Sequence, residues 1–375
     1  MKHVRPLSFN SSKLSPELGQ RVVDTDDPDK ALYLPEEYDI MPTGRCMFRC
    51  AGCWGASHSS PEPSYSAEHW TAVANFAERQ NRHYRTLNHG SRELSVCISG
   101  GEPLLYWDIV KLAGSLPLAG VRTTLSTTGN GPEGVFEEVI TSGIHELGIP
   151  IDASSGEINA LWRQGKISDG GLQNAIRAIR LSQEIAPGVL TTIRTLLHDG
   201  NVGYVAQIPD LLEKNGIDTS KIIWKGYLFN AFTGPRIGQA GVPTRLNADG
   251  LKGSIDSIYG ARDRFLDVAI KASTHTHPRL IIGPDGGCAF EPIRSIEDAS
   301  SAKDVYVGNI FSEPAKVVHR LNGDFQQFLA HCNNAAGMDR LIQMLDIPFT
   351  DLDASDLRLL TDQIMGIEMP AYLEL

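Results

Sequence analysis

The sequence of 375 residues lacks the features that mark several classes of protein. No uninterrupted apolar run approaches the ~20 residues that cross a bilayer, and the N-terminus has no apolar segment of a secretory signal. It has no block rich in Lys and Arg and its net charge is −11, so nucleic acid is not expected as an obligate partner. Only six cysteines are present. We therefore expect a cytoplasmic protein without a membrane partner, whose cysteines are thiols or metal ligands.

The rest of the composition is that of an ordinary globular protein. Apolar residues make up 41% of the chain and charged residues 21%, with 36 Gly and 21 Pro. These values exclude disordered and collagen-like classes, and the length suits one or two domains. We expect a polar N-terminal extension over residues 1–35, a core domain over residues 36–230 and a C-terminal extension over residues 231–375.

Short β-rich runs alternate with amphipathic helical runs in the expected core domain. The expected strands are Glu37–Met41, Leu94–Ser99, Val121–Thr127, Glu146–Ile151, Val189–Leu197 and Lys221–Leu228. The expected helices include Ala67–Arg85, Gly134–Ser142, Gly171–Ile185 and Val202–Asn215. This alternation predicts βαβ units and an α/β fold with a parallel sheet or barrel. After a Gly- and Pro-rich loop at residues 232–241, we expect a helix near Ser254–Ala272, a strand at Arg279–Gly283 and helices at Pro314–His331 and Ala335–Leu345.

Three of the six cysteines lie within eight residues, as Cys46-x3-Cys50-x2-Cys53. They follow the first expected strand, on a loop at its carboxyl end, where α/β barrels carry their active sites. Three thiolates on one loop can hold a soft metal centre. One interpretation is a structural zinc ion with His58 as the fourth ligand. The other is a [4Fe–4S] cluster with one iron left open, and the spacing favours the cluster.

A second motif, Gly100-Gly101-Glu102-Pro103, directly follows the strand expected at 94–99. Two glycines let a ligand approach the backbone closely, and Glu102 can accept a hydrogen bond from an amine or hydroxyl. Together the two motifs resemble the radical S-adenosylmethionine (radical SAM) superfamily, over the region from about 37 to 230. The resemblance implies a partial (β/α)6 TIM-like barrel, with a C-terminal α/β extension closing its open side.

The resemblance also implies the cofactors and the reaction. One [4Fe–4S] cluster would be held by Cys46, Cys50 and Cys53, and its open iron would bind SAM. An electron from a reductase such as flavodoxin or ferredoxin would cleave SAM to a 5′-deoxyadenosyl radical, which abstracts hydrogen from a small-molecule or peptide substrate in a biosynthetic pathway. The C-terminal part holds only Cys288 and Cys332, so no second cluster is expected.

Further SAM contacts follow from the resemblance, residue by residue. Gly100, Gly101 and Glu102 would contact the SAM amino group, and Arg194 would pair with the SAM carboxylate. The remaining implied SAM contacts are Ser126, Thr128, Asn130 and Asp152. The sequence departs from the family pattern in two places: Pro150 stands where a Ser is common, and Gly52 stands where an aromatic residue is usual, with Trp54 two places on.

A rival motif is Gly129-Asn130-Gly131-Pro132-Glu133-Gly134, which fits a dinucleotide-binding turn after a strand. Asp152 lies near the spacing of a ribose-binding acid. However, Glu133 would bring negative charge beside a pyrophosphate, and Pro132 removes a backbone donor. The alternatives to a radical SAM enzyme are thus an NAD(P)-dependent oxidoreductase that uses this turn and a zinc-stapled binding protein.

Cys97 lies on the second expected strand, where Leu94, Val96 and Ile98 alternate with more polar residues. In a barrel the apolar set faces the helices, which leaves Cys97 inside. There its thiol could donate hydrogen to a substrate radical, as it does in epimerase-type members of the family. The alternative is a small buried residue of the core.

Overall fold

The computed structural model describes residues 37–50, 53, 65–75, 78, 95–118, 120–228, 248–271, 279–291, 305–312 and 317. The N-terminal extension expected over residues 1–35, the loop at 232–241 and, apart from residue 317, the helices expected at 314–331 and 335–345 lie outside the described residues. No helix in the described part of the chain has the length and apolar character needed to cross a membrane.

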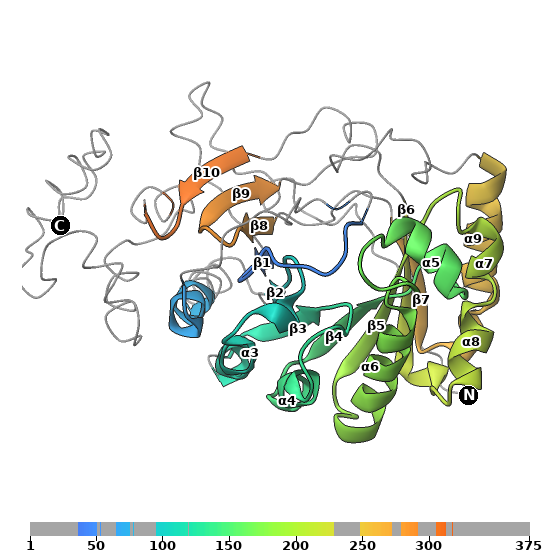
Figure 1. The fold of residues 1–375 in the computed structure, drawn as a ribbon, viewed down its shortest axis with the longest axis horizontal. Coiled ribbons are helices and arrows are strands. Elements are labelled where there is room, and N and C mark those ends of the chain that lie inside the picture. The colour runs from blue at the N-terminus through green and yellow to red at the C-terminus, as the bar shows by residue number, and fades with distance from the viewer. Residues whose placement is uncertain are drawn as a thin grey trace, which may run out of the picture.

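The described strands form one ten-stranded sheet in the order β10-β9-β8-β1-β2-β3-β4-β5-β6-β7 (Figure 1). The strands are β1 (Glu37–Ile40), β2 (Ser95–Ile98), β3 (Arg122–Ser126), β4 (Glu146–Pro150), β5 (Leu190–Leu197), β6 (Ile222–Leu228), β7 (Asp267–Lys271), β8 (Arg279–Ile282), β9 (Gly287–Glu291) and β10 (Val305–Asn309). All neighbours from β8 to β7 in this order pair in parallel, whereas β9 pairs antiparallel with both β8 and β10. The architecture is therefore a mostly parallel α/β sheet of the partial-barrel type.

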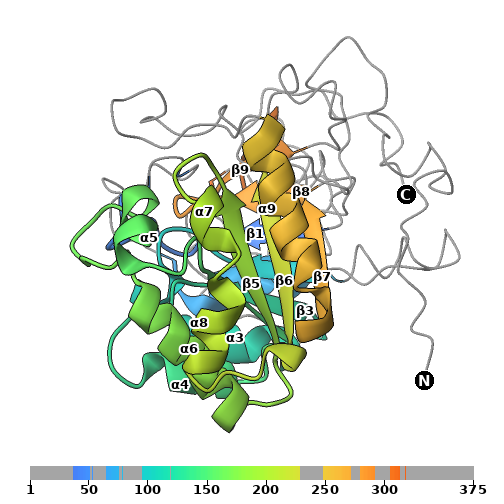
Figure 2. The same cartoon turned by 90° about the vertical axis from the view of Figure 1, so that its right-hand side faces the viewer.

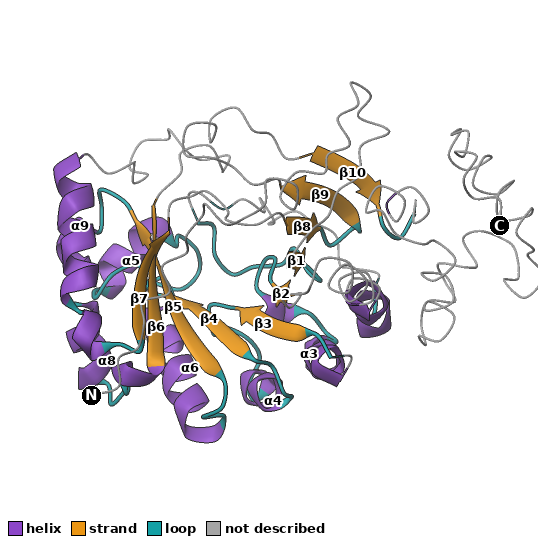
Figure 3. Ribbon diagram, turned by 180° about the vertical axis from the view of Figure 1, so that it is seen from behind, coloured by secondary structure: helices purple, strands orange, loops and turns teal. Residues whose placement is uncertain are grey.

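Helices cover the outer face of this curved sheet (Figures 2 and 3). They are α3 (Ile109–Leu118), α4 (Val135–Thr141), α5 (Gly156–Trp162), α6 (Leu172–Ile185), α7 (Val202–Val205), α8 (Ile208–Lys214) and α9 (Ala248–Gly260), with short 3-10 turns η3 (Pro103–Leu105), η4 (Thr219–Lys221) and η5 (Arg262–Arg264). In α6 the residues Leu172, Ala175, Ile176 and Ile179 recur at helical spacing and are buried. This apolar stripe joins the core between the helices and the sheet.

Alternation along each strand separates this core from the inner face of the sheet. In β2, Val96 and Ile98 are fully buried members of the core, whereas Ser95 and Cys97 line a cavity on the opposite face. This arrangement confirms the predicted inward direction of Cys97. The same period of two places side chains of β1–β6 and β8 on the cavity face of the sheet.

The six strands predicted in the core domain are confirmed, and each end differs from the prediction by at most one residue. The helix expected at Ser254–Ala272 is wrong in its second half, because α9 ends at Gly260 and Asp267–Lys271 form β7. In β7, Val268 and Ile270 alternate with Asp267, Ala269 and Lys271, and the segment pairs with β6. Pairing with a distant strand therefore overrides the local helical pattern. The strands β9 and β10 and the helices α3 and α5 were not predicted.

The chain beyond residue 230 adds strands at both edges of the sheet. The strand β7 extends the β6 edge, and β8 pairs with β1 at the other edge, followed by β9 and β10. No pairing joins β7 to β10 among the described strands. These strands therefore widen a sheet that is open among the described residues, and the expected closure of its open side by the C-terminal extension stays a prediction. The domain boundary near residue 230 stays a prediction.

Candidate active site

One cavity of about 660 Å³ runs along the inner face of the sheet. Its walls are the inward-facing residues of β1–β6 and β8, and its mouth is formed by loops at the carboxyl ends of the strands. Loop residues at the mouth include Cys46, Cys50, Cys53, Gly100, Gly101, Thr127, Thr128, Asp152, Trp162 and Arg163. Of the residues predicted from the sequence, the cavity brings together the three clustered cysteines, Cys97, Gly100, Gly101, Ser126, Thr128, Asp152 and Arg194.

The three clustered cysteines are half-buried free thiols on the loop after β1. Burial raises the pKa of the Cys46 thiol to about 12 and that of Cys50 to about 11. The backbone N–H of Phe48 donates to Cys46 Sγ at 3.4 Å, and Arg163 Nη1 lies 3.9 Å from Cys50 Sγ as a donor. Donors of this kind stabilise metal-bound thiolates.

This donor set fits an iron–sulfur cluster. In the described part of the chain, no three His, Cys, Asp or Glu side chains converge on a position for one metal ion. A cluster instead binds each thiolate to a different iron, so its ligands surround a space rather than a point. Three thiols around the mouth of one cavity meet that requirement. The zinc ligand considered above, His58, lies outside the described residues.

The two glycines of the second motif leave room for the backbone of the cysteine loop, which packs directly against them. Gly100 has a φ of +117°, and a Cβ there would lie 2.6 Å from the Thr43 carbonyl oxygen. A Cβ on Gly101 would lie 2.6 Å from the carbonyl carbon of Arg45. Gly101 N–H donates to the Thr43 carbonyl at 2.9 Å, and Glu102 N–H donates to the Arg45 carbonyl at 2.7 Å. The sequence predicted a ligand close to these glycines, and here the close segment is the loop that leads into Cys46.

Glu102 is fully buried and does not line the cavity. Its carboxylate accepts from Leu104 N–H at 3.2 Å, from Thr128 N–H at 2.8 Å and from the hydroxyls of Thr127 and Thr128. Glu102 thus ties the loop after β2 to the loop after β3. The direct SAM contact implied for it stays a prediction, and its described role is to position Thr128 at the cavity wall.

Asn130 is also buried away from the cavity. Its side-chain amide donates to the carbonyl and hydroxyl of Thr128, each at 3.1 Å, and accepts from Asn174 on α6. It therefore acts on the same Thr128 that Glu102 holds. A SAM contact from Asn130 remains a prediction.

Two of the three glycines of the rival dinucleotide motif are explained by packing inside the protein. A Cβ on Gly129 would lie 2.8 Å from Ala178 Cβ, and a Cβ on Gly131 would lie 2.5 Å from Leu104 Cβ. These positions face α6 and η3, not the cavity. The structure therefore favours a packing role for the turn over a pyrophosphate-binding role.

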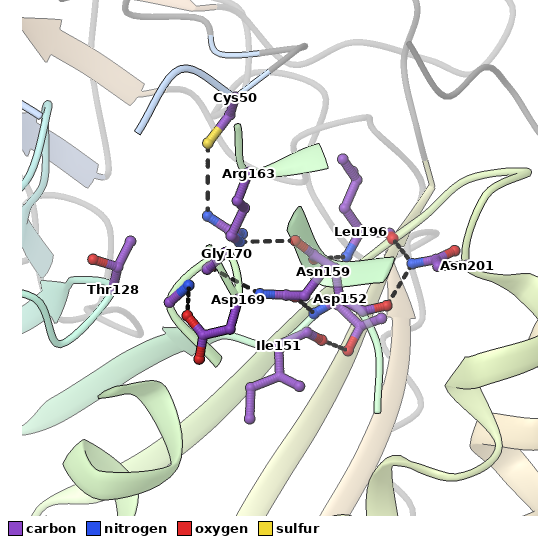
Figure 4. Close-up of polar contacts among 12 residues, drawn as sticks. Cys50, Thr128, Ile151, Asp152, Asn159, Arg163, Asp169, Gly170, Leu196 and Asn201 are labelled. Atoms are coloured by element: carbon purple, nitrogen blue, oxygen red, sulfur yellow. Dashed lines mark hydrogen bonds and ion pairs between the residues drawn. The ribbon is translucent and has the colours of Figure 1, made fainter. Parts of the chain in front are cut away.

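Asp152 follows β4 and anchors a charged network at the cavity mouth (Figure 4). Its Oδ2 lies 2.9 Å from Arg163 Nε, and its Oδ1 accepts from Leu196 N–H at 2.9 Å. The backbone N–H of Asp152 donates to Asn159, and its carbonyl accepts from Asn201. Asp152 therefore orients Arg163, whose other end reaches Cys50.

Sequence reasoning missed Arg163 as a site residue. It is the residue after the short helix α5, and its partners Asp152 and Cys50 lie 11 and 113 residues away in the sequence. No local motif marks it. The nearest signal is an Arg among buried Trp162 and Asn159, in a segment that faces the carboxyl ends of the strands.

Arg194 projects from β5 over a glycine of β4. A Cβ on Gly148 would lie 2.5 Å from Arg194 Nη2 and 2.7 Å from Nε, so only glycine leaves room for the guanidinium. Nη1 donates to Ser126 Oγ at 2.9 Å. Burial lowers the pKa of Arg194, but neighbouring groups including Tyr227 and Cys97 outweigh it and the pKa is raised. The side chain is therefore a permanent cation beside Ser126.

Deeper in the cavity, Cys97 lies in register with Asp39 on β1 and Thr124 on β3. Asp39 accepts from Ser99 Oγ and lies 3.5 Å from Arg279 Nη1. Burial raises the pKa of Asp39, and burial also raises the pKa of the Cys97 thiol well above its usual range. Cys97 is therefore protonated at neutral pH and carries a hydrogen atom into the cavity.

The floor of the cavity is charged, unlike the apolar interior of an ordinary α/β barrel. Glu146 lies 3.5 Å from Lys225 Nζ and 3.9 Å from Arg122 Nη2, and it accepts from Thr192 at 2.9 Å. These residues were not predicted as site residues, although their inward direction follows from strand alternation. Such a surface suits a polar ligand.

Comparison with known proteins gives a family match for part of the chain. Residues 40–211 match the family model described as the radical SAM superfamily. No curated protein matches the sequence. Among solved structures, Streptococcus suis SuiB bound to S-adenosylmethionine is similar with a TM-score of 0.52 and 14% identity over 73% of this chain. Streptococcus suis SuiB bound to its precursor peptide SuiA gives 0.51 and 16% over 73% of this chain.

The match spans only 63% and 62% of the length of these two SuiB chains, and at this identity it shows the fold alone. The fold agrees with the partial barrel described above. The family match contains all three clustered cysteines as well as Glu102 and Arg194. Residues 40–211, which hold both sequence motifs and most of the residues that line the cavity, are therefore assigned to the radical SAM superfamily.

Proposed function

We propose that Cys46, Cys50 and Cys53 hold one [4Fe–4S] cluster at the mouth of the barrel cavity, and that the enzyme uses it to cleave SAM. The observation that carries this proposal is that all three thiols line the same cavity as the inward-facing residues of β1–β6. The spare cysteines support a single cluster, since only Cys97, Cys288 and Cys332 remain in the sequence.

When bound, the cluster and SAM supply a 5′-deoxyadenosyl radical that abstracts hydrogen from the substrate. The protein contributes hydrogen-bond donors to the ligand sulfurs and a cavity for SAM and the substrate. Phe48 N–H and Arg163 donate to two of the ligand sulfurs. Gly100, Gly101, Thr128 and Asp152 line the cavity beside the cysteines and form the proposed SAM-binding surface. Glu102 and Asn130 support that surface by fixing Thr128.

The proposed substrate is a polar small molecule or a peptide side chain in a biosynthetic pathway. The charged cavity floor supports polarity. The similar structure of SuiB bound to its precursor peptide supports the peptide class. The lack of cysteines for auxiliary clusters supports the small-molecule class.

We also propose that Cys97 is a hydrogen donor to a substrate radical. Its S–H faces the cavity and stays protonated. Transfer of that hydrogen atom would leave a thiyl radical, which one electron from the external reductase, such as flavodoxin or ferredoxin, and one proton from water would restore. For an identified substrate turned over in D2O, this role requires one deuterium in the product, lost in Cys97→Ala.

The first test is EPR spectroscopy of cluster-reconstituted, dithionite-reduced protein, with and without SAM. We expect a [4Fe–4S]⁺ signal that shifts when SAM is added. Cys50→Ala should lose the signal and SAM cleavage, whereas Cys288→Ala should retain both, because Cys288 is fully buried and does not line the cavity. Stoichiometric zinc and no iron signal after reconstitution would overturn the proposal in favour of a zinc-stapled protein.

A further inference from the structure

The guanidinium of Arg194 is held in the cavity with hydrogen-bonding capacity to spare. It lies against Gly148, and its Nη1 donates to Ser126 Oγ at 2.9 Å. Its Nε is buried and has no hydrogen-bond partner within the described residues. A buried donor without a partner is costly in a folded protein. The free edge of this guanidinium is therefore suited to a ligand.

The charged residues of the cavity wall indicate the sign of the charge on that ligand. Each of four other cations in the cavity wall lies within 4.0 Å of a carboxylate: Arg163 of Asp152, Arg279 of Asp39, and both Lys225 and Arg122 of Glu146. Among the described residues, no carboxylate lies within that distance of Arg194. Its charge is balanced only at longer range, so an anion gains more at Arg194 than at the other four positions.

We propose that Arg194 and Ser126 bind a carboxylate of the substrate, so that the enzyme acts on a compact carboxylate-bearing molecule or on a carboxylate-bearing residue of a peptide. A guanidinium binds a carboxylate through two parallel hydrogen bonds, and the neighbouring hydroxyl can rotate to donate a third. This inference rests on the proposed radical SAM function and names the substrate class for it.

The carboxylate of SAM is the competing occupant, and the position of Arg194 disfavours it. The cation that reaches a cluster ligand is Arg163, 3.9 Å from Cys50 Sγ. The Arg194 guanidinium instead packs on Gly148, which is in register with Ser126, and its strongest electrostatic neighbours are Tyr227 and Cys97 in the cavity wall. A carboxylate at Arg194 therefore lies next to the proposed hydrogen donor.

Two variants perturb this site by different routes. Arg194→Gln removes the charge. Gly148→Ala keeps it but places a methyl group against the guanidinium, where a Cβ would lie 2.7 Å from Nε. The matched control is Arg180→Gln, an arginine on α6 whose side chain is 50% exposed.

The probe is acetate, with acetamide as its neutral counterpart. Each is titrated into cluster-loaded protein without SAM, and binding is followed by the line width of its methyl signal in proton NMR. We expect the dissociation constant of acetate to rise about 10-fold or more in Arg194→Gln and Gly148→Ala, but not in Arg180→Gln, as the loss of a charged hydrogen bond implies. An unchanged dissociation constant of acetate in the first two variants, or acetate that binds no more tightly than acetamide to the wild type, overturns the inference.

SAM binding distinguishes the source of the carboxylate. The EPR shift of the reduced cluster is titrated with SAM in the wild type and in Arg194→Gln. A midpoint that rises about 10-fold or more in the variant assigns Arg194 to the SAM carboxylate and overturns the inference. A midpoint that rises by less supports it. If SAM causes no shift in the wild type, the proposed function itself fails, which is a different result from either of these.

Discussion

Replacing Asp152 by Asn tests whether the ion pair with Arg163 organises the cavity mouth. Asn keeps the size of the side chain, and its Oδ1 can still accept from Leu196 N–H, which lies 2.9 Å from Asp152 Oδ1. The substituted group then places an N–H2 donor against Arg163 Nε, which lies 2.9 Å from Oδ2. The variant thus removes the ion pair and leaves the backbone contacts in place.

The expected loss follows from burial. The side chain of Asp152 is 1% exposed and that of Arg163 is 13% exposed, so little water can replace either partner. Removal of one member of a buried ion pair costs about 3–5 kcal/mol. Since Arg163 also lines the cavity, partial hydration of its guanidinium places the expected loss at the lower end, about 3 kcal/mol.

Urea unfolding of the cluster-free protein, followed by circular dichroism, measures this loss. Glu184→Gln is the matched control, because it breaks a surface ion pair with Arg180 at 55% exposure, and such a pair contributes at most about 1 kcal/mol. Arg163→Met in the Asp152→Asn background should cost less than the sum of the single variants, since neither charge is then left alone. A loss below about 1 kcal/mol for Asp152→Asn, with additive double variants, would refute the buried pair.

Two further predictions concern the cysteine loop and the cavity wall. Gly101→Ala should lower iron incorporation and cost at least about 1–3 kcal/mol, because its Cβ would meet the backbone of the cysteine loop at 2.6 Å. The control is Gly114→Ala on α3, whose Cβ would meet Ser142 Cβ at 3.6 Å and the Ser142 carbonyl oxygen at 3.8 Å, both ordinary contacts, so this variant should retain iron. Burial raises the pKa of Asp39 above 3.8, so the native state binds this proton more tightly than the unfolded chain and stability falls as pH rises through the raised pKa. Urea titrations between pH 4 and 8 should show the wild type losing stability relative to Asp39→Asn, and a parallel pH dependence of the two proteins would contradict this.

The strands of the core could be predicted from the sequence because the alternation of apolar and polar residues is a local property. Val96 and Ile98 face the helices, which leaves Cys97 inside, and that inference needs no tertiary information. The strand β7 could not be predicted in the same way. Its five-residue alternation is too short to compete with a helical pattern, and only its pairing with β6 decides the outcome.

The site was predictable where a motif is contiguous and unpredictable where contacts cross the chain. The cysteine loop and the two glycines after β2 are local patterns, and the structure brings them together. The hydrogen bonds of Glu102 could not be predicted, because three of its four donors are on Thr127 and Thr128, 25 and 26 positions away on the next loop. Arg163 carries no motif, since its importance arises only when the segment after α5 pairs with the cysteine loop through Phe48 and Gly165.

The order of these motifs in the sequence has a physical reason. Successive parallel strands bring successive loops side by side at one edge of the sheet. The loop after β1 carries the cysteines, the loop after β2 binds it through Gly101 N–H and Glu102 N–H, and the Glu102 side chain holds the loop after β3 through Thr127 and Thr128. The Glu102 carboxylate and the two glycines Gly100 and Gly101 thus fix three loops in place. The geometry of this cavity wall therefore does not depend on a ligand alone, because its loops are hydrogen-bonded to one another.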